Sequence, residues 1–178
     1  MYLPRLPPFA TARLPRPTGA WLLVLCAAAW LWVGWSLAQV HLDRTQALAL
    51  ERYGQKAAET VASWRKMMDD GRALSELDKL AVANTFFNRR LLFEDDIVLW
   101  KQNDYWATPL EFIGQGAGDC EDFAIAKYVS LQMMGVPAQK LRLIYVRARV
   151  GGTSVAHMVL GYFETPMAEP LILDNLVG

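Results

Sequence analysis

The sequence predicts an α+β domain in which helices come first and an antiparallel sheet follows. Apolar residues recur every three or four positions through the first part of the chain, and every second position after Pro137. A third observation is an uncharged hydrophobic segment near the N-terminus, which precedes this domain. A chain of 178 residues that is 53% hydrophobic fits one globular domain with a short leader.

The leader is the segment Gly19–Ala38, which is uncharged and follows three arginines and no acid. This charge bias keeps the N-terminus in the cytoplasm. The sequence Ser36-Leu37-Ala38 suits signal peptidase, yet a segment of about 20 residues is also long enough to remain as an anchor. We therefore expect residues 1–38 to be a signal peptide or an N-terminal membrane anchor, and residues 39–178 to lie outside the cytoplasm.

The exported part has a small net negative charge. The whole chain is neutral, and loss of the three leader arginines leaves 15 basic against 18 acidic residues. No stripe of lysine or arginine dominates any predicted element, which excludes the usual footprint of a nucleic-acid-binding protein. Any contact with a membrane is expected only through an uncleaved leader.

Two amphipathic helices are predicted to open the domain. The first extends from His41 to about Met68 and ends at 69–71, with its apolar face formed by Leu50, Tyr53, Ala57, Val61, Trp64 and Met68. Ser75, with Asp78 three residues later, predicts the cap of a second helix that continues to about Arg89. We expect this second helix to bury Leu77, Leu80, Ala81, Asn84 or Phe87.

The next segment, 91–107, is rich in aromatic residues and lacks a clear period. We expect an ordered loop with an extended piece around 97–99. Thr108 followed by Pro109 is typical of the start of a helix, here a short one to Phe112.

The glycine-rich stretch 114–118 is predicted to form a sharp turn, since three of its five residues are glycines. Asp119 and Asp122 have the spacing of a capping box, and the helix that they begin ends at Met134-Gly135. Cys120 then lies in the first turn of this helix, where the positive end of the dipole favours a thiolate.

Three strands are predicted after Pro137: from Leu141 to just before the glycine pair at 151–152, from 155 to 163, and from 171 to about 176. If the last two form a hairpin centred between Thr165 and Pro166, His157 and Asp174 lie directly opposite each other. Directly opposed side chains in an antiparallel pair point to the same face of the sheet.

Cysteine and histidine are scarce in this chain. Cys26 lies in the leader, so Cys120 is the single cysteine of the exported domain and has no partner for an internal disulfide. Of two histidines, His41 lies at the leader junction, which leaves His157 as the base for a thiol nucleophile and Asp174 as the acid that orients it. Each of these two residues also has a non-catalytic interpretation. A histidine in the middle of a strand is more often a packed or surface residue, and Asp174 also fits the turn at the end of a strand.

Four segments resemble the bacterial transglutaminase-like cysteine proteinases: 104–109, 118–127, 156–160 and 173–176. The resemblance extends from about Trp64 to the last residue. It implies a papain-like/transglutaminase-like core with Cys120 as nucleophile, His157 as base and Asp174 as orienting acid. It also implies more sheet after the third strand, so we expect either a fragment or a domain that is trimmed at its C-terminus.

The resemblance further implies a periplasmic protease that cuts the N-terminal region of a large surface adhesin beside a pair of alanines, and so releases cells from a biofilm. An inner-membrane receptor that responds to cyclic di-GMP is the implied inhibitor. Two rival functions fit the same residues: acyl transfer to an amine by a transglutaminase or amidase, and calcium-dependent binding by a module with a vestigial triad.

The resemblance implies a calcium ion held by Asp119, Glu121 and Asp122. Three carboxylates in four residues offer the hard oxygens that Ca²⁺ prefers, although the spacing is not that of an EF-hand. The cap spacing of Asp119 and Asp122 supports a purely structural alternative. Carboxylates beside Cys120 raise the pKa of its thiol unless a cation neutralises them, which favours the metal.

Overall fold

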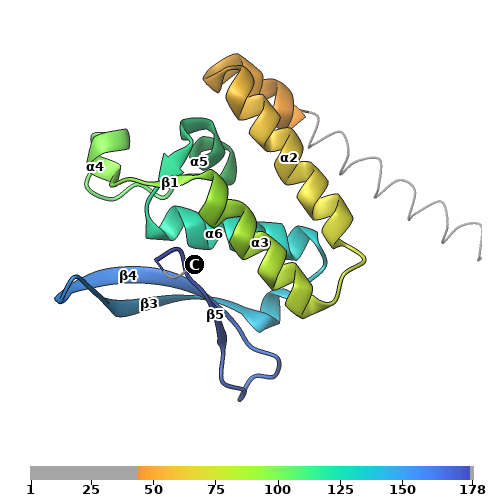
Figure 1. The fold of residues 1–178 in the computed structure, drawn as a ribbon, viewed down its shortest axis with the longest axis vertical. Coiled ribbons are helices and arrows are strands. Elements are labelled where there is room, and N and C mark those ends of the chain that lie inside the picture. The colour runs from red at the N-terminus through yellow and green to blue at the C-terminus, as the bar shows by residue number, and fades with distance from the viewer. Residues whose placement is uncertain (1–43, 177–178) are drawn as a thin grey trace, which may run out of the picture. The chain divides into compact units, whose positions relative to one another are not determined.

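The computed structural model describes residues 44–176, and the leader, Cys26 and His41 lie outside this range. Helices precede an antiparallel sheet, as predicted (Figure 1). The helices are residues 44–53, α2 (Gln55–Gly71), α3 (Glu76–Arg90), α4 (Asp96–Leu99), α5 (Pro109–Gln115), α6 (Cys120–Met133) and the 3-10 turn η1 (Ala138–Lys140). The strands are β1 (Leu92–Phe93), β2 (Ala117–Gly118), β3 (Leu141–Val150), β4 (Thr153–Tyr162) and β5 (Leu171–Leu173).

The first predicted helix is divided in the structure. Gly54 has φ of 86° and separates residues 44–53 from α2, because only glycine adopts this left-handed region at little cost. The apolar face of α2 is confirmed, with Ala57, Val61, Trp64 and Met68 buried. Leu50 is 51% exposed, since it precedes the break and its orientation is set by a separate helix.

Helix α3 begins as predicted, but the set of residues that it buries in the core differs from the predicted set. The Asp78 N–H donates to Ser75 Oγ, which confirms the cap. The residues buried on α3 are Lys79, Leu80, Ala83, Phe86 and Phe87. The predicted Leu77 is 60% exposed and Ala81 is exposed, because at 3.6 residues per turn they lie roughly 120° and 160° from Ala83 at the centre of the stripe.

The segment after α3 contains a correction. Residues 97–99 belong to helix α4 rather than to an extended piece, and the carbonyl of Asp95 accepts hydrogen bonds from the N–H groups of Val98 and Leu99. The extended residues are instead those of β1, which pairs in parallel with β2. The β-branched side chains at 97 and 98 are exposed, so no packing enforces their strand preference.

Helix α5 begins and helix α6 ends with the predicted local signals. Thr108 and Glu111 form a complete capping box at the start of α5, which extends to Gln115. At the end of α6, Gly135 has φ of 90° and the Val136 N–H donates to the Leu131 carbonyl, which is the hydrogen-bond pattern of a Schellman motif. The start of α5 and the end of α6 are therefore fixed by local chemistry.

The three-stranded sheet has the order β3-β4-β5, and all its pairs are antiparallel. The predicted register is wrong by two residues, because Leu160 pairs with Leu173 and the hairpin is centred after Pro166. His157 is thus not directly opposite Asp174. A shift of one residue turns a side chain to the other face, whereas a shift of two keeps its face.

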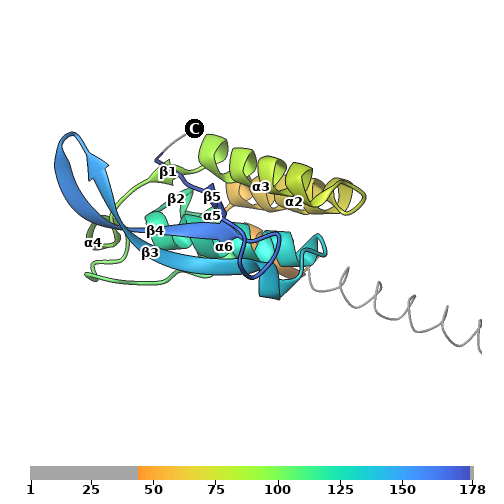
Figure 2. The same cartoon turned by 90° about the horizontal axis from the view of Figure 1, so that it is seen from below.

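Helix α6 is packed against β4 and against α3, and α2 covers α3 (Figures 1 and 2). The aromatic rings of Phe87, Phe112 and Phe123 join α3, α5 and α6, with centroid distances of 6.1 Å and 4.7 Å between successive rings. This core fixes the start of α6 over the sheet. None of the helices within residues 44–176 has the length and hydropathy needed to cross a bilayer.

Candidate active site

Cys120 is the first residue of α6, and strand β2 fixes its approach. The pairing of β2 with β1 holds Gly118 two residues before the sulfur. A Cβ at Gly118 would clash with the Asp122 carboxylate and the Phe112 ring, so the close approach of backbone and helix requires glycine. Cys120 is half-buried and carries no disulfide.

The surroundings of Cys120 differ from the predicted thiolate site. Burial raises the pKa of its thiol to about 12, helped by a hydrogen bond that Sγ donates to Glu121 Oε2 at 3.0 Å. A hydrogen bond from the Met158 backbone N–H acts in the opposite direction. Burial and the adjacent carboxylates therefore outweigh the helix dipole. The Met158 contact also places the sulfur against β4, beside the residue that follows His157.

His157 and Asp174 form a hydrogen-bonded pair, with 2.8 Å between Nε2 and Oδ1. His157 is only 3% exposed and comes from the middle of β4, whereas Asp174 follows the last residue of β5. The bond occupies Nε2, so Nδ1 is the ring nitrogen left for another partner. The structure thus brings together the predicted histidine and acid despite the register shift.

The Asp174 carboxylate is stabilised in its charged form. Burial acts to raise its pKa, but the Leu176 N–H and His157 outweigh this effect and hold the pKa below its ordinary value. The Leu176 N–H donates to the same Oδ1 at 2.9 Å. A charged Asp174 that accepts from Nε2 fixes the orientation of the imidazole.

The predicted metal-binding residues lie in a larger acidic cluster. Asp96 and Asp104, which the sequence did not single out, approach Glu121, and Asp96 also approaches Asp119 and Asp122. In each group, one ligand oxygen per residue lies within 4.8 Å of the others. The run of three acids at 94–96 was the available signal, but only the fold shows which of its carboxylates turns inward.

Several oxygens in this cluster have no hydrogen-bond partner. They are Asp96 Oδ1, Asp119 Oδ1 and Asp122 Oδ2, and all three are buried. Asp119 occupies the N-cap position of α6, but its side chain makes no capping hydrogen bond, so the predicted capping box is wrong. Asp122 instead accepts from the Ala107 N–H at 2.8 Å, which turns it toward the loop.

Electrostatic repulsion is the result of this crowding. Burial, followed by the charge of Glu121, raises the pKa of Asp119 to about 8. Burial also raises the pKa of Asp122 to about 6 and raises that of Asp96, in each case against a backbone N–H that lowers it. Buried, unpartnered and mutually repelling carboxylate oxygens are the donor set that suits a hard cation such as Ca²⁺.

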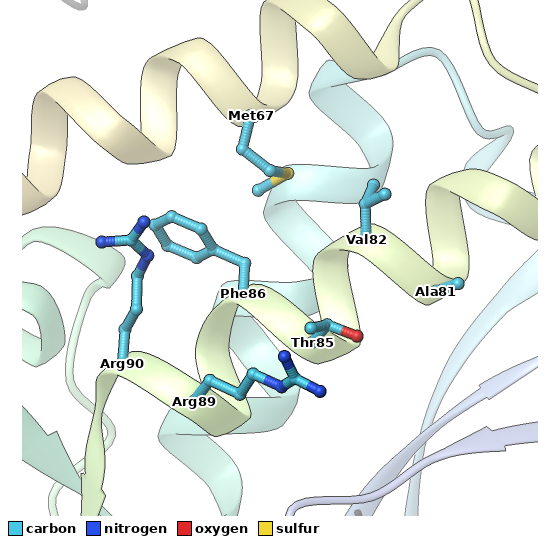
Figure 3. Close-up of a pocket in the computed structure, with 7 residues that line it drawn as sticks. All are labelled: Met67, Ala81, Val82, Thr85, Phe86, Arg89 and Arg90. Atoms are coloured by element: carbon cyan, nitrogen blue, oxygen red, sulfur yellow. The ribbon is translucent and has the colours of Figure 1, made fainter.

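A separate groove lies between α2 and α3, and it contains none of these residues. Figure 3 shows its lining, which combines the apolar side chains of Met67, Val82 and Phe86 with two arginines, Arg89 and Arg90. The Arg90 guanidinium lies 5.0 Å from the centre of the Phe86 ring. This groove is therefore separate from Cys120, His157, Asp174 and the acidic cluster.

Several solved structures are similar to this chain. No curated protein matches the chain. Among solved structures, Legionella pneumophila LapG matches with 38% identity and a TM-score of 0.65, and the match covers 76% of this chain and 72% of that one. A calcium-bound structure of Legionella pneumophila LapG gives the same values. An EGTA-treated structure of that protein matches with 39% identity and a TM-score of 0.64, covering 76% of this chain and 70% of that one.

The family comparison covers nearly all of the described part of the chain. The sequence model of the bacterial transglutaminase-like cysteine proteinases matches residues 46–177. This range includes Cys120, His157 and Asp174, together with the acidic residues around the start of α6. The chain belongs to the bacterial transglutaminase-like cysteine proteinase family, and it is a cysteine protease of the LapG type.

Proposed function

We propose that this protein is a calcium-dependent periplasmic cysteine endopeptidase that cleaves the N-terminal region of a large surface adhesin. The observation that carries the proposal is the hydrogen bond from His157 to Asp174, on the strand whose next residue, Met158, contacts the sulfur of Cys120. These three residues supply a nucleophile, a base and an orienting acid, the combination that acyl-enzyme hydrolysis requires.

In this mechanism, the Cys120 sulfur attacks the carbonyl carbon of the scissile peptide bond after its proton moves to His157 Nδ1. His157 then donates this proton to the leaving amine, which departs and leaves a thioester on Cys120. His157 next takes a proton from water, whose oxygen attacks the thioester; the carbon–sulfur bond breaks, the second product leaves as the acid, and the proton on His157 returns to the Cys120 sulfur. Asp174 holds the imidazole throughout, and the Cys120 backbone N–H at the start of α6 is the oxyanion donor.

Calcium would be held by Asp119, Glu121 and Asp122, and the positions of Asp96 and Asp104 add two further carboxylates. The unpartnered buried oxygens of Asp96, Asp119 and Asp122 support this ligand set. A bound Ca²⁺ supplies positive charge that offsets the carboxylates whose presence raises the pKa of Cys120. The similarity to a calcium-bound LapG adds support.

The adhesin substrate, the periplasmic location and inhibition by an inner-membrane receptor for cyclic di-GMP are proposed from the family resemblance. An exported domain needs a leader, and the uncharged segment Gly19–Ala38 supports that part of the proposal. A protease of this kind acts on a chain that is itself exported to the cell surface.

The test is incubation of the purified protein with a recombinant adhesin N-terminal fragment that contains an alanine pair, followed by mass spectrometry. We expect two shorter chains whose masses sum to the fragment plus one water. Cys120→Ala, or EGTA added to the wild-type protein, should leave the fragment intact. One heavier product would instead indicate acyl transfer to an amine, and an intact fragment with calcium present would contradict the proposal.

A further inference from the structure

The backbone of Asp174 is not held by the sheet. The ladder between β4 and β5 ends at the pair Leu160 and Leu173, one residue before Asp174. The side chain of Asp174 nevertheless needs a fixed direction, because its Oδ1 accepts from His157 Nε2 at 2.8 Å. Another part of the structure must therefore hold the peptide that carries this carboxylate.

Two side chains from two different helices donate to the carbonyl oxygen of Asp174. Asn88 Nδ2 of α3 lies 2.7 Å from this oxygen, and Lys127 Nζ of α6 lies 3.1 Å from it. The two donors saturate the lone pairs of the carbonyl. They fix the peptide plane after Asp174, and with it the direction in which the Asp174 side chain leaves the backbone.

Lys127 is an unusual residue to find at this place. It is only 1% exposed, and burial lowers the pKa of its ammonium to about 7 against the attraction of Asp174. Its Nζ also lies 5.6 Å from the centre of the Phe123 ring. Lysine is rarely buried so completely, and an uncharged side chain of similar length would fill the same space without the desolvation cost.

Lys127 also connects the acid to the helix of the nucleophile. It follows Cys120 by seven residues, which is two helical turns or roughly 10 Å along α6, on the same face. Helix α6 is packed against β4, the strand of His157. A path of contacts thus leads from Cys120 along α6 to Lys127, and from there to Asp174 and His157. It returns to the sulfur through the Met158 contact.

Resting on the proposed function, we propose that Lys127 and Asn88 are positioning residues, which hold the Asp174 carbonyl so that its carboxylate orients His157 toward Cys120. Neither residue touches the reacting atoms. A purely structural role would instead anchor the end of the chain without affecting the imidazole. The two roles differ in what happens to His157 when a donor is removed.

The kinetic test compares Lys127→Met and Asn88→Ala with wild type on the alanine-pair adhesin fragment. We expect kcat to fall by up to about a hundredfold with little change in KM, because misplacement of a catalytic group by about 1 Å costs this much. In an Asp174→Ala background the same substitutions should have no further effect on kcat, since no carboxylate remains to be oriented. Lys79→Met, which removes a second buried lysine, on α3, is the matched control and should leave kcat unchanged.

The spectroscopic test reads the imidazole directly in the Cys120→Ala protein. With only two histidines, a ¹H–¹⁵N imidazole spectrum is simple to assign. We expect Lys127→Met to shift the His157 Nε2–H resonance and to speed its exchange with water, while Lys79→Met leaves both unchanged. Unchanged kcat and an unchanged His157 resonance in a folded Lys127→Met protein would overturn the inference.

These two readouts separate the inference from the proposed function. Absence of cleavage by the wild-type protein would contradict the protease proposal, yet the His157 resonance would still report whether Lys127 positions the imidazole. A lower melting temperature of Lys127→Met with an unaltered His157 resonance would indicate an anchor only and would likewise overturn the inference.

Discussion

His157 Nε2 lies 2.8 Å from Asp174 Oδ1 although the two residues are not paired in the sheet. The contact is diagonal, since the register of β4 and β5 would place residue 176 opposite His157 if the strands continued. The chain leaves β5 at Leu173, and Asp174 turns back toward β4. This departure from the ladder is what brings a carboxylate to a buried imidazole.

Replacement of Asp174 by asparagine should therefore impair catalysis without unfolding the protein. In Asp174→Asn the new side chain retains the shape of the acid but cannot stabilise an imidazolium. We expect kcat to fall by a factor of about 10² to 10⁴ in the adhesin-cleavage assay, while KM changes little. Glu169→Gln, in the connection between β4 and β5, is the control and should retain wild-type kcat. Equal activity of both variants would exclude Asp174 from the mechanism.

Calcium should raise the melting temperature of the protein. The cluster of Asp96, Asp119, Glu121 and Asp122 places carboxylates together in buried surroundings, and a bound cation removes this repulsion. At a concentration of 100 times Kd, binding contributes about 2.7 kcal/mol, which corresponds to a shift of roughly 5 to 10 °C. The measurement is a thermal melt with CaCl₂ or EGTA.

Two variants check where this calcium effect originates. Asp96→Asn should reduce the shift in melting temperature, because it removes a buried charge from the cluster. Asp70→Asn, on the exposed side of α2 and paired with Lys66, should leave it unchanged. A shift of the same size in both variants would place the ion elsewhere.

Lys127 should make stability rise with pH above neutrality. Burial lowers its pKa to about 7 from an ordinary 10.5. Between these values the unfolded chain holds a proton that the folded protein lacks, so raising the pH stabilises the folded state relative to the unfolded one.

 This proton difference persists until the unfolded lysine itself titrates near 10.5. The state that binds more protons is disfavoured as the pH rises, so the net effect is that folding is favoured between about pH 7 and 10.5. Below about pH 7 both states are protonated and the cost of the buried charge is present in full.

The measurement for Lys127 is the urea midpoint at pH 7 and pH 9, compared between wild type and Lys127→Met. We expect the urea midpoint of the wild type to increase more than that of Lys127→Met between pH 7 and pH 9. Lys56→Met, at an exposed position on α2, should behave as wild type does. Parallel curves for wild type and Lys127→Met would show that the ammonium is not penalised by burial.

Ser75→Ala should lower stability without altering the site. Ser75 Oγ accepts from the Asp78 N–H at the start of α3, and loss of such a cap costs about 1 kcal/mol. We expect a fall of a few degrees in melting temperature, measured by circular dichroism, with unchanged kcat. Thr85→Ala, in the interior of the same helix, should change little.

Local chemistry explains which parts of this fold the sequence could predict. Ser75 and Thr108 begin helices because their side chains bond to N–H groups three residues away, and Gly135 ends α6 because it tolerates a positive φ. Each of these signals is contained within a few residues. The same is true of the alternation that predicts β3, so these features can be predicted without knowledge of the fold.

The contact of His157 with Asp174 was predicted, but other features that depend on distant residues were not. The register of β4 and β5 depends on how residues 163–170 turn between the strands, and a shift in the centre of that turn means that Asp174 is not directly opposite His157 as predicted. Asp96 joins the acidic cluster because α4 forms where an extended piece was expected. The contact of Lys127 with Asp174 joins residues 47 positions apart, for which no local pattern exists.

The proposed chemistry requires that Cys120 is a nucleophile served by His157. The decisive experiment is intact-mass measurement of the calcium-loaded protein during reaction with an acetyl-Ala-Ala chloromethyl ketone. We expect a single adduct on Cys120, formed at least about a hundredfold more slowly in His157→Ala, since general-base assistance contributes at least that factor. Equal rates in the two proteins, or an adduct on another residue, would show that His157 does not activate this sulfur.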